Sequence, residues 1–128
     1  MKLLFLASAG GAIGAGLRFL VNQAFAARGL ISYPWATLTV NVVGAFLMGA
    51  VMTLVMERFE GSPEIRTFLA TGILGGLTTF SAFTYEVSQL ITVEGAASPR
   101  VLFYVAASVL FSLAALYAGI TITRAVLP

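Results

Sequence analysis

The chain has 128 residues, of which 59% are hydrophobic and only 9% are charged. A soluble domain carries about 25% charged residues, so this chain cannot cover a surface that faces water. The net charge of +2, without any lysine- or arginine-rich run, argues against nucleic acid as a partner. Because cysteine and histidine are absent, disulfides, thiol chemistry, zinc sites and imidazole proton relays are excluded.

Four apolar stretches have the roughly 20 residues that a membrane-spanning helix needs. We therefore expect an all-α membrane protein. It forms one transmembrane domain, 1–128, with helices over about 3–27, 34–56, 64–91 and 99–126.

The first stretch begins like a signal peptide, but apolar sequence rich in glycine and alanine continues well beyond one. We interpret it as a retained membrane helix. Its single charge, Arg18, either reaches an interface or lines an aqueous vestibule, where it attracts anions. Gly10 and Gly14 form a G-x-x-x-G pattern, which is typical of a close contact with another helix.

The second stretch is uncharged and carries one amide, Asn41. An amide in hydrocarbon needs a partner across a helix interface or in a watery cavity. Its two N–H donors can also bind an anion directly. The sequence leaves both roles open for Asn41.

The third stretch contains two glycines, Gly75 and Gly76, followed closely by Thr78 and Thr79. Both residue types lower helix stability, so we predict a break over Gly75–Thr79. A break frees backbone carbonyls at mid-membrane depth, where only protein, water or an ion can satisfy them. Converging carbonyls bind hard cations, whereas glycines also serve close helix packing. Both interpretations remain open.

Beyond the break, Phe80, Phe83 and Glu86 recur every three residues and share one helix face. The edge of a phenyl ring is positive, so ring edges can line a path for a small anion. A stripe of this kind is more often lipid-facing or packed. An intramembrane carboxylate tends to face a cavity or a partner, which places Glu86 at a vestibule unless it reaches the membrane interface.

In the fourth stretch, Tyr104, Ser108 and Ser112 recur every four residues and share one face. Their hydroxyls can replace the hydration shell of an anion. Serine also serves plain helix packing in membranes, and this alternative stays open.

Four spans place both chain ends on one side of the membrane. The basic residues divide four to two between the sides: Lys2, Arg58, Arg66 and Arg124 against Arg28 and Arg100. This bias slightly favours cytoplasmic termini. It also suits a chain that inserts both ways round.

Taken together, these segments resemble the CrcB/Fluc family of fluoride channels over nearly the whole chain. The run Gly75-Gly76-Leu77-Thr78-Thr79-Phe80-Ser81, followed by Phe83, is the most specific part. Asn41 stands at its expected place. The other matching segments are Gly14 to Arg18, Thr37 to Gly44, Gly72 to Glu86, and Tyr104 with Ser108 and Ser112.

The resemblance implies a channel rather than an enzyme, which passively exports fluoride across the inner (plasma) membrane and so relieves fluoride toxicity. It implies an antiparallel, dual-topology homodimer with two pores. A structural sodium ion, which is not transported, would be held by the main-chain carbonyls of Gly75 and Thr78. The implied pore residues are Asn41, Phe80, Phe83, Ser81, Tyr104, Ser108 and Ser112, with Arg18 and Glu86 at the vestibule or nearby.

One position departs from the family pattern, because Ala82 stands where a hydroxyl residue is common. If that hydroxyl coordinates fluoride, conduction here is slower or the polar track runs through Ser81 and Thr84.

Two other functions fit parts of the sequence. A drug/proton antiporter of the small multidrug resistance type matches the size, but it works through a glutamate in its first helix, and the first stretch here has no carboxylate. A non-transporting membrane assembly subunit would pass neither fluoride nor a lipophilic cation in liposomes.

Overall fold

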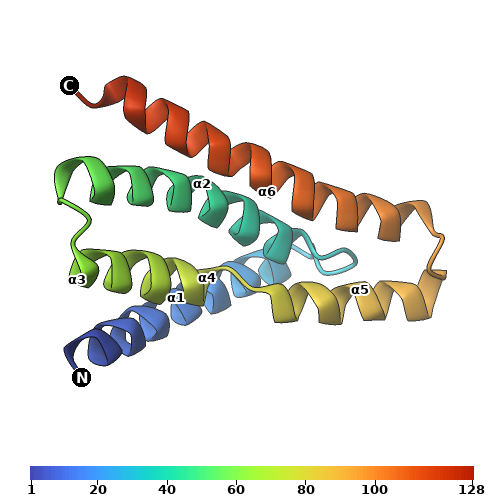
Figure 1. Ribbon diagram of the computed structural model, residues 1–128. Coiled ribbons are helices and arrows are strands. Elements are labelled where there is room, and N and C mark those ends of the chain that lie inside the picture. The colour runs from blue at the N-terminus through green and yellow to red at the C-terminus, as the bar shows by residue number, and fades with distance from the viewer.

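The computed structural model describes residues 1–128, which form helices and short connections without any strand. In chain order the elements are α1 (Lys2–Ala27), α2 (Trp35–Arg58), α3 (Pro63–Arg66), η1 (Thr67–Leu74), α4 (Gly75–Leu77), α5 (Phe80–Glu94) and α6 (Pro99–Val126). α3, η1, α4 and α5 follow one line and together make the third pass through the bundle (Figure 1). The chain ends lie at the same end of the bundle.

Four helical segments are long and apolar enough to cross a membrane: Lys2–Ala27, Trp35–Arg58, Pro63–Glu94 and Pro99–Val126. They correspond to the four predicted stretches and confirm the all-helical fold class. Only 21 of the 128 residues are buried, and large apolar side chains such as Phe5 and Leu20 are more than half exposed. Such an apolar surface would be unfavourable in water, but it is favourable against the apolar tails of lipids.

The predicted contact through Gly10 and Gly14 is present, and it joins α1 to η1 and α4. A Cβ atom at Gly10 would lie 2.5 Å from the Phe68 carbonyl oxygen, and one at Gly14 would collide with the carbonyl oxygen of Ile73. Glycine is required there because the backbones themselves touch. This contact fixes the third pass against α1.

η1 is a π-helix of eight residues, which the sequence pattern did not predict. The N–H of Gly75, which follows it, donates to the carbonyl of Ala70, five residues back, instead of four. π-helices are rare and mostly occupy single turns within α-helices. Here the π-helix leads directly into α4 and the break.

The predicted break in the third pass is confirmed, but it is narrower than Gly75–Thr79. Only Thr78 and Thr79 are extended, with φ/ψ of −79°/154° and −155°/122°. Gly75 and Gly76 remain helical. The reason is packing, because a Cβ atom at Gly76 would lie 2.5 Å from the carbonyl oxygen of Gly11 on α1. At Gly76, glycine serves close packing, and the break belongs to the two threonines.

Candidate functional site

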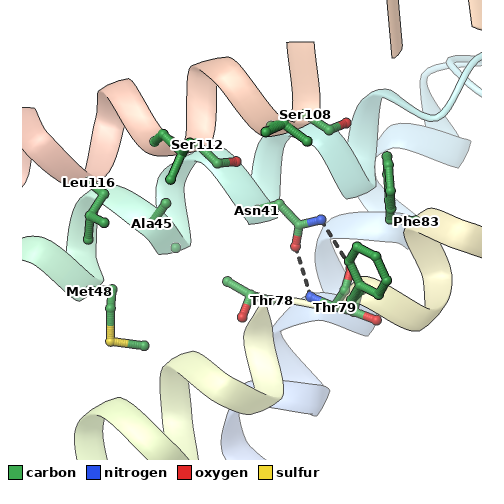
Figure 2. A pocket seen from close by; sticks show the side chains of 13 residues that line it. Asn41, Ala45, Met48, Thr78, Thr79, Phe83, Ser108, Ser112 and Leu116 are labelled. Atoms are coloured by element: carbon green, nitrogen blue, oxygen red, sulfur yellow. Dashed lines mark hydrogen bonds between the residues drawn. The ribbon is translucent and has the colours of Figure 1, made fainter. Parts of the chain in front are cut away.

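A groove of about 360 Å³ opens between α2, α6 and the break. Polar groups from three passes meet in it, and Figure 2 shows the serines of α6 facing the threonines of the break across it. Its lining comprises Asn41, Gly44, Ala45, Met48, Thr78, Thr79, Phe80, Phe83, Ser108, Val109, Ser112, Leu113 and Leu116. The groove therefore contains five of the seven predicted pore residues: Asn41, Phe80, Phe83, Ser108 and Ser112.

Asn41 is bonded to the break itself. Its Oδ1 accepts from the N–H of Thr79 at 2.8 Å, and its Nδ2 donates to the Thr79 carbonyl at 3.1 Å (Figure 2). These bonds satisfy both main-chain groups of a residue that has left the helix. Of the two roles left open for Asn41, the structure therefore shows the hydrogen bond to another pass of the bundle, and its partner there is the main chain of Thr79. One N–H of the amide remains available at the groove.

The two ends of the break are closed by side chains. The Thr79 hydroxyl accepts from the N–H of Ala82 at 3.1 Å and so caps the start of α5. On the other side, Arg18 donates from Nε to the carbonyl of Gly76 at 3.2 Å. A cation is favourable at that position because the carbonyl end of a helix is negative. Arg18 thus lies at the break, and whether it also faces a vestibule stays a prediction.

Ser108 and Ser112 lie on the opposite wall of the groove, and the hydroxyl oxygen of each is buried without a hydrogen-bond partner. Buried polar groups are normally paired, so two adjacent unpaired hydroxyls require an explanation. They offer two donors to a ligand that accepts hydrogen bonds.

Phe80 and Phe83 form an aromatic pair at the end of the groove, with ring centroids 5.4 Å apart and planes inclined by 41°. Phe83 is 8% exposed and packed in the core, whereas Phe80 is 75% exposed. Of the two rings in the predicted stripe, Phe83 is therefore packed and Phe80 is exposed. A partner chain or lipid must cover Phe80.

Tyr104 and Glu86 lie beyond Phe83, outside the groove. The Tyr104 ring, fully buried, stands 5.4 Å from that of Phe83. Its hydroxyl donates to one Glu86 oxygen at 2.6 Å, and the Thr37 hydroxyl donates to the other at 2.6 Å. Both oxygens of the half-buried carboxylate are thus paired. Sequence reasoning did not single out Thr37, although it lies in a segment that carries the family resemblance.

Ser81 and Thr84 do not line the groove. The Ser81 hydroxyl shares a hydrogen bond with Thr79 at 3.1 Å, and the Thr84 hydroxyl donates to the Ser81 carbonyl at 3.0 Å. Both residues are exposed on α5. They are nevertheless linked by these bonds to Thr79, which lines the groove. A polar track through Ser81 and Thr84 in place of the hydroxyl absent at Ala82 stays a prediction.

Two carbonyls at the break, those of Gly75 and Thr78, have no side-chain partner, whereas those of Gly76 and Thr79 accept from Arg18 and Asn41. Thr78 accepts no hydrogen bond through its carbonyl, and no side chain reaches that of Gly75. The chain holds no cluster of acidic, histidine or cysteine side chains suited to a metal. Main-chain oxygens are the ligands that hard cations accept, so Gly75 and Thr78 fit the predicted sodium site in kind. Two carbonyls are too few for one ion, and a second copy would have to supply more.

Residues 5–120 match a family described as "CrcB-like protein, Camphor Resistance (CrcB)". A protein of Rhizobium meliloti named "Fluoride-specific ion channel FluC" is 43% identical over 125 residues, which cover 98% of both chains. A protein of Chelativorans with the same name is 47% identical over 97% of this chain and 98% of its own.

A third protein of this name, from Rhizobium etli, is 46% identical over 94% of both chains. The shared name is that of an ion channel and not of an enzyme, as expected from the resemblance. Together with the four spans, these findings identify a multi-pass membrane protein, which in bacteria lies in the inner membrane. The chain belongs to the CrcB-like family.

Proposed function

We propose that this protein is a fluoride-selective channel that lets the ion leave the cytoplasm passively. The observation that carries the proposal is the pair of unpaired hydroxyls, Ser108 and Ser112, buried in the groove opposite Asn41. Fluoride is a small, strong hydrogen-bond acceptor, and charge-assisted hydrogen bonds are the stronger kind. Donors that line the groove can replace the water molecules around the ion, while the ring edges of Phe80 and Phe83 add weak positive potential.

The names of the relatives support this ion over others, because fluoride-specific channels match nearly the whole chain. The groove lining also favours a channel over a proton-coupled antiporter. It includes no carboxylate, and α1 has no acidic residue that could exchange protons for substrate.

The pore is incomplete in one chain, so we propose an antiparallel homodimer with two pores. The groove is open along one side, and Phe80 at its end is 75% exposed. A second copy of opposite orientation would cover both. The weak bias of basic residues permits this dual topology.

A sodium ion at the centre of the dimer is part of the proposal. The Gly75 and Thr78 carbonyls of each copy would hold it. When bound, the ion would supply positive charge that joins the copies and raises the potential near the anion path.

Efflux from liposomes tests the channel. The purified protein should release fluoride quickly and chloride hardly at all, without any proton gradient. Equal chloride flux, or dependence on a proton gradient, would overturn the proposal.

A matched set of variants tests the groove. Ser108→Ala combined with Ser112→Ala should lower fluoride flux about tenfold or more, since the site loses two donors. Melting in detergent should not worsen, because neither hydroxyl has a partner to lose. Ser8→Ala, on the exposed face of α1, is the control and should change neither. Unchanged flux in the double variant would contradict the groove as the path.

A further inference from the structure

Arg100 and Tyr33 meet at the end of the bundle opposite the chain termini. The Arg100 guanidinium lies 5.2 Å from the centroid of the Tyr33 ring, and the Tyr33 hydroxyl donates to the Arg100 carbonyl at 3.0 Å. Arg100 also donates from Nη2 to the Ser32 carbonyl at 3.2 Å. Three bonds and contacts therefore tie the start of α6 to the loop between α1 and α2.

A row of rings connects this cluster to the groove. Consecutive centroids are 5.4 Å apart for Phe80 and Phe83, 5.4 Å for Phe83 and Tyr104, and 5.8 Å for Tyr104 and Tyr33. Arg100 stands at the outer end of the row. The Arg100 guanidinium therefore lies at the solvent-exposed end of the row of rings.

A second cavity, of about 380 Å³, opens at this end and reaches inwards to Glu86. Its walls carry two carboxylates, Glu86 and Glu94, and one cation, Arg100. Two negative charges would repel an entering anion. Arg100 is the only lining residue that opposes them.

The charge pair at the mouth is asymmetric. Arg100 and Glu94 form an ion pair of 2.7 Å, in which the side chain of Arg100 is 52% exposed and that of Glu94 is 20% exposed. Water therefore meets mainly the cation. Arg100 also occupies the second residue of α6, where the positive end of the helix disfavours a cation. Helix stability alone does not explain this choice of residue.

We propose that Arg100 recruits anions to the mouth of the pore by offsetting the charges of Glu86 and Glu94. This inference rests on the proposed channel function. The alternative role is a structural one, in which Arg100 only fastens the loop to α6. The two roles differ in what happens when both members of the ion pair are neutralised.

The experiment measures initial fluoride efflux from liposomes at low and high ionic strength for four variants. A unit charge several ångströms from an anion in water changes its local concentration about threefold. Arg100→Gln should thus lower efflux about threefold, and Glu94→Gln should raise it by a similar factor. The double variant should return close to the unmodified rate, and Arg100→Lys should retain it.

High salt is the second readout. At about 1 M ionic strength the screening length falls to about 3 Å, so the rates of all four variants should converge. Arg28→Gln, at the same end but bonded only to the Ala24 carbonyl of its own helix, is the control and should change efflux little.

The results distinguish a failure of the channel proposal from a failure of the role proposed for Arg100. If the unmodified protein passes no fluoride, the channel proposal itself fails. If it conducts, but the double variant stays as slow as Arg100→Gln and salt has no effect, Arg100 is structural and this inference is wrong. Equal rates in all four variants at low salt would overturn it as well.

Discussion

Asn41 and Thr79, 38 positions apart, exchange two hydrogen bonds that satisfy both main-chain groups of Thr79. The amide of one helix thus replaces the helical bonds that another has given up. This relationship explains how an extended residue persists inside the bundle without an unsatisfied backbone group. Oδ1 and one N–H of the Asn41 amide are used in these bonds, and the second N–H remains available at the groove.

Replacing Asn41 should therefore damage stability and conduction together. Asn41→Ala leaves two half-buried backbone groups of Thr79 without their partner, at a cost of up to about 1–3 kcal/mol each. We expect a lower melting temperature in detergent and a loss of fluoride efflux. Asn41→Asp keeps the acceptor for the Thr79 N–H but adds negative charge, so it should block efflux with a smaller loss of stability. Unchanged melting of Asn41→Ala would contradict the two-bond description.

The neighbouring glycines, Gly75 and Gly76, should separate assembly from folding. A Cβ atom at Gly75 would lie 3.6 Å from the Ala70 carbonyl oxygen, an ordinary contact, and Gly75 is exposed. Gly75→Ala should therefore leave the fold of the single chain intact. It should weaken the proposed dimer and its response to sodium, because we expect the added methyl group to meet the partner copy.

Gly76→Ala is the contrasting variant. Its Cβ atom would lie 2.5 Å from the Gly11 carbonyl oxygen, so the helices must separate, at about 1–3 kcal/mol. Thermal melting and size-exclusion chromatography, in sodium and in a large organic cation, distinguish the two variants. Thr78→Ser should resemble the unmodified protein, since the proposed ligand is the carbonyl. A dimer indifferent to sodium in all variants would remove the cation from the proposal.

Tyr33 should make the fold sensitive to strong alkali. Burial raises the pKa of Tyr33, and the Glu94 carboxylate acts in the same direction, while Arg100 partly opposes them. A raised pKa in the folded state means that the contribution is complete below the unfolded value of about 10 and is lost as pH rises through the folded one.

Tyr33→Phe is the test of this behaviour. It removes the hydrogen bond to the Arg100 carbonyl, which costs about 1 kcal/mol at neutral pH. Melting temperatures measured from pH 8 to 11 should fall more steeply for the unmodified protein than for the variant. Parallel curves would show that Tyr33 does not titrate with unfolding.

The sequence predicted the four spans and the break because both depend on local properties, namely apolar length and poor helix formers. The exact extent of the break depends on packing instead. Gly76 resembles a helix breaker in isolation, yet it stays helical because Gly11 of α1 lies against it. Distinguishing a glycine that breaks a helix from one that packs it requires knowledge of the neighbouring helix.

The site shows the same division. Asn41, Ser108 and Ser112 all line the groove. Helical periodicity had predicted that the two serines share one face of their helix. Periodicity could not show that Glu86 is held by Thr37 and Tyr104, since that contact joins three different helices. Roles of all these residues in conduction stay predictions until flux is measured.

The π-helix η1 bears on how such a chain could be edited. A π turn accommodates one residue more than an α turn in the same stretch. One residue within Thr67–Leu74 could therefore be deleted by replacing a π turn with an α turn, and the residues after it would keep their direction relative to α1. Thr79 would still face Asn41. The same deletion in a regular α-helix such as α1 would rotate everything after it in that helix by about 100° and change which side chains face the neighbouring helices.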